Sequence, residues 1–465
     1  MKKQTAIDMC SGPVLGKILM FSLPLMASGI LQLLFNAADV MVVGNFCGSV
    51  AMAAVGSNGA VINLIVNLFL GISIGTNVLV ARSWGRQHAD SVFRAVHSSV
   101  ALSMILGVFT GIFGAVMAPK MLTLLSVPAD VLPLASLYLR IYFIGIPATV
   151  VYNFGAAILR AIGNTRQPLY YLSISGALNV LCNIILVIGF KMDVAGVAIA
   201  SAISQYVAAF LVLRYLTKLE NACRLSFRML RLYRYETLEM IRIGIPAGLQ
   251  STVFSISNVL IQSAINAFGA AAIAGNVAAM NIDNIIYIAL NAIHHAAVSF
   301  ISQNLGAGKL DRIVRIARSC LLMTLAIGGV MCVVTLLAGE SLLTIFNREP
   351  DVIAAGMVRI RNAGAFYFLC GLMEVSCGIV RGMGSSWLPM IVSMVGVCGI
   401  RIGWIYTIFA AFPTLQVLYI SYPVTWIITM LIHLLCAVLV YKRLKLRHAP
   451  KSKTQMPEFT HESAK

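Results

Sequence analysis

The chain has 465 residues, of which 59% are hydrophobic and only 11% are charged, and its formal net charge is +18. Soluble domains carry about 25% charged residues, so this composition excludes an ordinary soluble globular protein. Apolar stretches of about 20 residues recur along the chain, as membrane-spanning helices require. The alternating segments of about ten residues that are typical of a membrane β-barrel do not occur. We therefore predict an all-α integral membrane protein.

The apolar stretches predict twelve helices, six in each half of the chain. In chain order they are expected at 15–43, 51–79, 95–117, 134–158, 168–190, 194–216, 238–265, 275–301, 316–338, 356–379, 388–410 and 416–440. The predicted layout is an N-terminal cytoplasmic segment (1–14), an N-lobe of helices 1–6 (15–216), a cytoplasmic linker (217–237), a C-lobe of helices 7–12 (238–441) and a basic cytoplasmic tail (442–465).

Three local features add detail to this layout. Arginines interleaved with apolar residues over 217–242 predict a helix lying in the membrane interface, with a solvated loop as the alternative. Pro24 and Pro246 fall at nearly equivalent places in helices 1 and 7, where a missing backbone donor bends a helix. The polar tail from His448 onward is expected to be disordered.

The two halves of the chain resemble each other. The stretch LRAIGNTRQP at 159–168 returns as VRGMGSSWLP at 380–389, displaced by 221 residues, and the Arg, the second Gly and the Pro coincide. The same displacement pairs other residues that separate the apolar runs, including Gly85 with Gly306 and Asp130 with Asp351. A duplicated unit of this kind predicts two pseudo-symmetric six-helix lobes, an arrangement common among secondary transporters.

The positive charge indicates how the chain is oriented in its membrane. Most Lys and Arg lie in the tails and in the loops after even-numbered helices. Cytoplasmic loops are rich in Lys and Arg, so both termini are expected in the cytoplasm of a multi-pass protein. The basic side chains are then expected to contact anionic lipid head groups, and their distribution argues against nucleic acid as a partner.

Four ionisable residues are predicted inside the membrane, where an ionised group costs about 2.5–3.5 kcal/mol and is a functional candidate by default. They are Asp39 in helix 1, Asp283 in helix 8, Glu374 in helix 10 and Arg401 in helix 11. A buried carboxyl can carry a proton, or it can bind Na⁺ together with neutral oxygens. The alternative for Asp39 is a hydrogen bond between helices. For Asp283 and Glu374 the alternative is a structural ion pair with Arg401.

Amide side chains supply further candidates. Asn179 and Asn183 lie one turn apart on helix 5 and share a face, where they either complete a cation site or form interhelical bonds without function. Asn36 lies one turn before Asp39 and is a candidate substrate contact. No His and Cys spacing forms a metal site, and no nucleotide-binding or hydrolase motif occurs. We expect no metal, no cofactor and no enzymatic activity.

Several motifs together resemble the multidrug and toxic compound extrusion (MATE) family, in particular the bacterial branch of DNA-damage-inducible (DinF-like) members. They are SLP and NAADVMVVG in helix 1, the loop pair ARSWGRQHADSVFRA and SQNLGAGKLDRIVRI, GVAIASAISQY in helix 6, and the repeated motif above. The resemblance covers about residues 12–445 and implies two lobes around a central cavity. It implies that Asp39 couples transport to an ion, and that Tyr138, Asn179 and Ser201 surround it. Relatives often have Asp where this chain has Asn183, which weakens a two-carboxylate Na⁺ site.

These observations predict a monomeric multidrug antiporter of a bacterial plasma membrane. It would expel cationic amphipathic compounds in exchange for H⁺, or Na⁺, by alternating access. A lipid-linked oligosaccharide flippase of the same superfamily is the alternative, but such a protein needs a more cationic cavity than Arg401 alone supplies. A membrane-embedded enzyme would need a catalytic constellation that the sequence does not contain. Asp39, Tyr138, Asn179, Asn183 and Ser201 are the candidate coupling residues; Asn36, Asp283, Glu374 and Arg401 are candidates for substrate binding or a C-lobe polar network.

Overall fold

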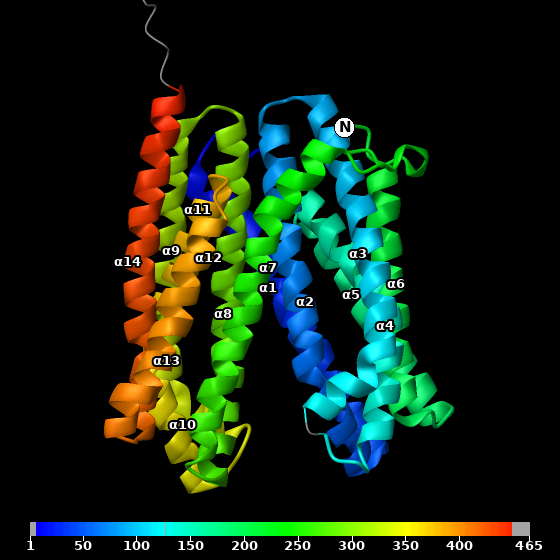
Figure 1. Ribbon diagram of the computed structural model, residues 1–465, viewed down its shortest axis with the longest axis vertical. Helices are drawn as coiled ribbons and strands as arrows, with labels where there is room; N and C mark the ends of the chain where they lie inside the picture. Colours follow the sequence, from blue (N-terminus) through cyan, green and yellow to red (C-terminus); the bar gives the residue numbers. More distant parts are fainter. Residues whose placement is uncertain (1–5, 126, 449–465) are drawn as a thin grey trace, which may run out of the picture.

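A computed structural model describes residues 6–125 and 127–448 of the chain. Within these residues the molecule is built of helices without strands, and twelve helical segments are long and apolar enough to cross a membrane. The segments form two side-by-side bundles, the N-lobe and the C-lobe (Figure 1). The fold predicted from the apolar runs is thus confirmed.

The N-lobe contains α1 (Val14–Phe46), α2 (Gly48–Gly85), α3 (Ala89–Leu124), α4 (Leu132–Ala161), α5 (Arg166–Asn183) continued by the π-helix η1 (Ile184–Gly189), and α6 (Asp193–Thr217). Most of these helices extend several residues beyond the apolar runs at one or both ends.

The C-lobe contains α7 (Arg234–Asn266), α8 (Ala270–Gly306), α9 (Leu310–Thr344), α10 (Pro350–Asn362), η3 (Gly364–Phe366), α11 (Tyr367–Gly382), α12 (Trp387–Ser393), η4 (Met394–Gly399), α13 (Ile400–Trp404), η5 (Ile405–Phe409) and α14 (Leu415–His448). The tenth predicted span is thus interrupted by a 3₁₀ turn, and the eleventh contains two π-helical segments. Because π-helical turns occur often at functional sites, the irregular spans are places to look for one.

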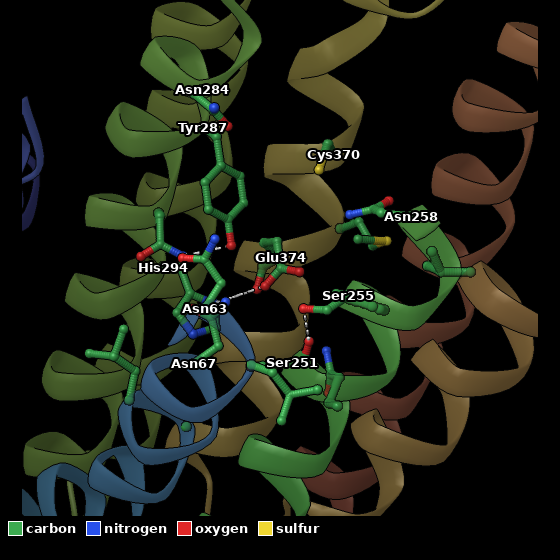
Figure 2. Close-up of a pocket in the computed structure, with 18 of the residues that line it drawn as sticks. Asn63, Asn67, Ser251, Ser255, Asn258, Asn284, Tyr287, His294, Cys370 and Glu374 are labelled. Atoms are coloured by element: carbon green, nitrogen blue, oxygen red, sulfur yellow. Dashed lines mark hydrogen bonds and ion pairs between the residues drawn. The ribbon is translucent and has the colours of Figure 1, made fainter. Parts of the chain in front are cut away.

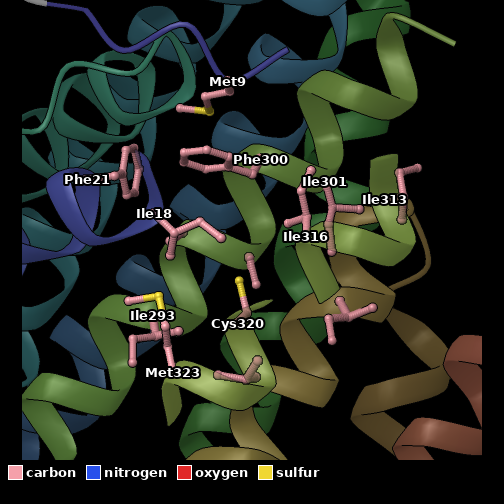
Figure 3. Packing of buried hydrophobic residues seen from close by; sticks show 14 of the residues in the cluster. Met9, Ile18, Phe21, Ile293, Phe300, Ile301, Ile313, Ile316, Cys320 and Met323 are labelled. Carbon is pink, nitrogen blue, oxygen red and sulfur yellow. The ribbon is translucent and has the colours of Figure 1, made fainter. Parts of the chain in front are cut away.

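Two helices begin against one lobe and end in the other. The start of α1 packs into the C-lobe, where the Phe21 ring meets Phe300 edge-on at 5.6 Å (Figure 3). Conversely, Met240 near the start of α7 belongs to a hydrophobic cluster of the N-lobe. Pro24 and Pro246 lie inside these helices just beyond the two contacts. Each proline removes one backbone hydrogen bond from its helix, so it weakens the helix close to where it changes lobes.

The lobes are joined near the end of the molecule at which both described termini lie, which we call the termini face. There α2 crosses α7 (Figure 1), and a Cβ placed on Gly71 would come within 2.4 Å of the Gly248 Cα. Small residues allow this close approach of helices in lipid, where association depends on packing. The Ser299 hydroxyl donates to Asn77 at 3.1 Å, so a polar contact also closes this side.

The N-terminal segment strengthens the same closure. The amide of Ile7 donates to the carbonyl of Gly163 in the N-lobe at 3.0 Å, while Asn304 and Arg312 of the C-lobe donate to the carbonyl of Met9. A hydrogen bond from the Ser11 hydroxyl lowers the pKa of Asp8. The segment therefore bridges both lobes on the termini face.

One expectation about the linker is wrong. Residues 218–233 do not form an interfacial helix; apart from the single 3₁₀ turn η2 (Phe227–Met229) they are irregular. The amide of Ser226 donates to His97 and that of Tyr233 donates to Ser98, so backbone bonds to α3 replace those of a helix. At the other end, α14 continues through the basic residues to His448, and the expected disordered tail, 449–465, lies outside the described residues together with residues 1–5.

Candidate functional site

The N-lobe holds Asp39 at one end of a chain of polar side chains. The Asn183 amide donates to the Asp39 carboxylate at 2.5 Å and to the Asn179 carbonyl oxygen at 3.3 Å. Asn179 in turn donates to the Ser201 hydroxyl at 3.3 Å. The chain thus links α1, α5 and α6, and brings together four of the five residues predicted for ion coupling.

Local helix geometry explains the order of these hydrogen-bonded side chains. Asn179 and Asn183 are four residues apart on α5, so they point the same way. The π-helix η1 starts directly after Asn183 and gives the span a wider turn at that point. Asn183 is fully buried, and its side-chain oxygen has no hydrogen-bond partner. A buried oxygen without a partner is costly, and here it belongs to the residue that contacts the carboxylate.

The remaining N-lobe candidates differ in their surroundings. Tyr138 is buried and belongs to a cluster that contains Val43 of α1 and Val187 of η1, so it packs close to the Asp39 region. Its ring stacks with that of Tyr142 at 6.2 Å. The side chain of Asn36 is exposed, and within the described residues no hydrogen bond joins it to Asp39, Asn179, Asn183 or Ser201.

Asp283 forms an ion pair with a residue that the sequence reasoning did not single out. Arg359 of α10 donates to the same Asp283 oxygen from Nε at 3.1 Å and from Nη2 at 2.9 Å, and both side chains are buried. Arg359 also donates to Asn276, which accepts from Tyr419. The suggested pairing of Asp283 with Arg401 is therefore wrong, because Arg359 is the basic partner of this carboxylate.

A cavity of about 750 Å³ lies between α2 and the C-lobe helices. It is rich in side-chain amides and hydroxyls, several of which are shown in Figure 2. Its polar neutral lining includes Asn63 and Asn67 of α2, Gln250, Ser251, Ser255 and Asn258 of α7, and Asn284, Tyr287 and Asn291 of α8. A concave site with a limited set of polar groups is the usual form of a small-molecule site. None of the N-lobe coupling candidates lines it.

Acidic and basic side chains also line this cavity. They are Glu374, Arg381, Arg401, His294 and His295. The Glu374 carboxylate lies 3.8 Å from His294 Nδ1, and the same nitrogen is 2.7 Å from the Glu374 backbone oxygen (Figure 2). The alternative that paired Glu374 with Arg401 is also wrong, because its close ionisable partner is His294. Within the described residues, no group of His, Cys, Asp and Glu is arranged to hold a metal ion.

Sequence reasoning missed two arginines of the C-lobe. Arg359 and Arg381 are both buried, whereas Arg401 was expected to be the only base in the middle of the membrane. Both lie on helices with a strong apolar face and near the ends of predicted spans. From such a position an arginine side chain can point to water or into the protein, so the sequence did not show that these two point into the protein. Arg381 donates to Gln250 of α7 at 2.7 Å. Arg381 occupies the position of the repeated motif that is equivalent to Arg160, and this repetition was the sequence signal that could have identified it.

Comparison with known proteins gives consistent matches. The MatE family model matches residues 24–185 and 246–407. A Bacillus subtilis protein described as probable multidrug resistance protein YpnP is 28% identical over 391 residues, covering 84% of this chain and 87% of its own. Another from the same organism, YoeA, carries the same description and is 24% identical, covering 89% and 91%.

Solved structures show the same fold. A multidrug resistance MATE family transporter of the MOP superfamily, solved in an outward-facing conformation, superposes with a TM-score of 0.88 at 21% identity, covering 96% of this chain and all of its own. The family model covers more than half of the present chain, in two segments of equal length, one in each lobe. This chain therefore belongs to the MATE family, whose members are membrane transporters and not enzymes.

Proposed function

We propose that this protein is a multidrug efflux antiporter that expels cationic amphipathic compounds in exchange for H⁺. Family membership and relatives described as multidrug resistance proteins support efflux of small molecules. The observation that carries the coupling step is the bond between Asn183 and Asp39. Within the described residues, Asp39 has no basic partner within ion-pair distance, so its charge can change without breaking a salt bridge.

The proton step follows from that environment. Loss of water around a carboxyl disfavours its ionised form, whereas an amide donor favours it. These two effects oppose each other and neither comes from a charged group, so Asp39 can change between its ionised and its protonated form. Protonation removes the negative charge, and the Asn183 amide then loses the acceptor that it prefers. A rearrangement of α1 against α5 is the consequence, and α1 also carries Pro24 and packs against the C-lobe at its start.

Transport by alternating access requires that the two faces open in turn. We assign the termini face to the cytoplasm, because the loops on that side carry most of the Lys and Arg. The contacts of Gly71 with Gly248 and of Asn77 with Ser299 then close the cytoplasmic side. This closure supports an outward-open conformation, from which substrate is released and a proton is accepted from outside.

The protein acts as a monomer in a bacterial plasma membrane, with its basic loops against anionic lipids. Na⁺ is the alternative coupling ion, with the Asp39 carboxylate and the free Asn183 oxygen as ligands of the type that hard cations prefer. A lipid-linked oligosaccharide flippase is not favoured by the relatives found.

The test uses everted membrane vesicles that contain the protein, a preset proton gradient and a pH-sensitive dye. Addition of ethidium to wild-type vesicles is expected to release protons in a Na⁺-independent manner. Asp39→Asn, which keeps the shape of the side chain, is expected to abolish this release. Asn45→Asp serves as a matched control for charge on the same helix, because Asn45 is exposed beyond Asp39. Proton release by Asp39→Asn equal to wild type, or transport that follows only Na⁺, would overturn proton coupling through Asp39.

A further inference from the structure

Two guanidinium groups of the C-lobe lie against the ring of Tyr422, and only one of them has a carboxylate partner. Arg359 lies 5.3 Å from the ring centroid and Arg401 lies 4.2 Å from it. Arg359 is neutralised by Asp283. Arg401 is 3% exposed and has no carboxylate within 4 Å among the described residues. Its one side-chain hydrogen bond goes from Nη2 to the Thr425 hydroxyl at 3.3 Å.

The unpaired guanidinium faces the cavity. Arg401 lines it, whereas Arg359 and Asp283 do not. The Nε atom of Arg401 is buried and has no hydrogen-bond partner. A buried cation without an anion is costly in a medium of low dielectric. The stacked tyrosine offsets part of that cost, but it takes up no N–H donor, and Thr425 takes up only one, on Nη2, so the guanidinium still lacks an anionic acceptor.

The charged side chains of the cavity lining also favour an anionic ligand. Of the ionisable side chains that line the cavity, one is a carboxylate, Glu374, and two are guanidiniums, Arg381 and Arg401. Arg381 contributes a second buried Nε without a partner. Glu374 and Arg381 lie seven residues apart on α11, so they share a face of the helix but lie two turns apart. Arg401 comes from another helix, α13, and we call Arg401 with Tyr422 and Trp426 the basic locus of the cavity.

The side chains around the basic locus indicate which other groups a ligand would carry besides an anionic one. Trp426 lines the cavity beside Tyr422, and their ring centroids are 5.5 Å apart with the planes at 67°. A flat aromatic body can pack against such a wall, while a carboxylate or sulfonate accepts the paired donors of a guanidinium. We propose that the cavity binds soluble aromatic organic anions through Arg401, in addition to the cations of the proposed function. The inference deepens that function, since it extends the substrate class of the same transporter.

The test compares two dyes that share a xanthene skeleton and differ in charge: fluorescein, an anion, and rhodamine 123, a cation. Their binding to the purified, detergent-solubilised protein is measured by fluorescence anisotropy. Wild type is expected to bind both. Arg401→Gln is expected to raise the Kd of fluorescein at least about tenfold relative to that of rhodamine 123, because hydrogen bonds to a charged group are lost. Arg361→Gln, an exposed arginine outside the cavity lining, is the matched control.

Other outcomes separate the explanations. Equal weakening of both dyes would show that Arg401 is merely structural, and undetectable fluorescein binding by wild type would overturn the proposal. Should Arg401→Gln fail to fold, Glu374→Gln provides the second arm, since removal of the carboxylate is expected to tighten fluorescein relative to rhodamine 123. Displacement of fluorescein by equimolar phosphatidylglycerol would reassign the locus to a lipid head group. The titration needs no ion gradient, so failure of coupling through Asp39 leaves its result unaffected.

Discussion

In the N-lobe, Asp39 is held by a neutral amide, whereas in the C-lobe Asp283 is held by a guanidinium that donates to it twice. The two acids lie on long helices of a membrane protein, but their partners give them different behaviour. Protonation of Asp39 would only weaken one hydrogen bond, because the Asn183 amide would then donate to a neutral carboxyl oxygen. Protonation of Asp283 would leave Arg359 as an uncompensated buried cation, which is strongly unfavourable.

This difference suggests how a two-lobed transporter divides its tasks. The lobe with an unpaired acid can change charge during a transport cycle, and the lobe with the paired acid keeps one arrangement of α8, α10 and α14. The rigid arrangement also positions Tyr422, which is shared by Arg359 and Arg401. The C-lobe is therefore suited to supply a fixed wall of the substrate cavity, whose other wall is α2 of the N-lobe, and the N-lobe is suited to respond to the ion.

Breaking the C-lobe pair is expected to give the largest effect. Arg359→Met leaves Asp283 buried without its cation and should lower the free energy of unfolding by about 3–5 kcal/mol. The double variant Asp283→Leu/Arg359→Met removes both charges and should recover at least half of that loss. Unfolding of the purified proteins by SDS titration in mixed micelles, followed by tryptophan fluorescence, measures both. A single variant as stable as wild type would show that the pair does not hold the lobe together.

The helical framework could be predicted from sequence, because twelve apolar runs and the charge bias of the loops depend on local composition alone. The chain of Asp39, Asn183, Asn179 and Ser201 could also be anticipated, since helical periodicity places the two asparagines on one face and the family resemblance supplies the other two residues. The pairing of Asp283 with Arg359 could not, because a long arginine near a span end can snorkel to water or reach inward. Only the packing of α10 against α8 decides between these directions.

The family resemblance implied a central cavity, but the residues that line it could not be predicted from the sequence. Asn63, Asn67, Asn258 and Asn284 come from three helices, and nothing in their local sequence indicates that they face one space. The π-helical segments in the fifth and eleventh spans change the direction of side chains within a helix, which a fixed period of 3.6 residues does not anticipate.

A second acid beside Asp39 tests whether the neutral partner of this carboxylate determines which ion it takes. Asn183→Asp replaces the amide donor with a carboxylate, which creates two adjacent acids without a basic partner. Two carboxylates attract a hard cation more strongly than one, so ethidium efflux by this variant is expected to become Na⁺-dependent, with stimulation of about tenfold, equivalent to ~1.4 kcal/mol. Efflux is measured in everted vesicles with and without NaCl at constant ionic strength. Asn45→Asp again controls for added charge, and efflux indifferent to Na⁺ would argue against a cation site at this position.

The smallest expected effect concerns Ser201, which lies at the end of the hydrogen-bonded series farthest from Asp39. Ser201→Ala removes the acceptor of the Asn179 amide, a neutral hydrogen bond of 3.3 Å that is worth about 0.5–1.5 kcal/mol. Asn183 then loses a fixed neighbour but keeps its bond to Asp39, so proton-coupled ethidium efflux should fall a few-fold and not disappear. Ser201→Thr retains the hydroxyl and should transport at nearly the wild-type rate, which makes it the matched control. If Ser201→Ala were as inactive as Asp39→Asn, the hydroxyl would be required for coupling itself, and the distinction between the acid and its supporting amides would have to be abandoned. A graded series, with Asp39 indispensable and Ser201 auxiliary, is what a single titrating acid held by neutral groups requires.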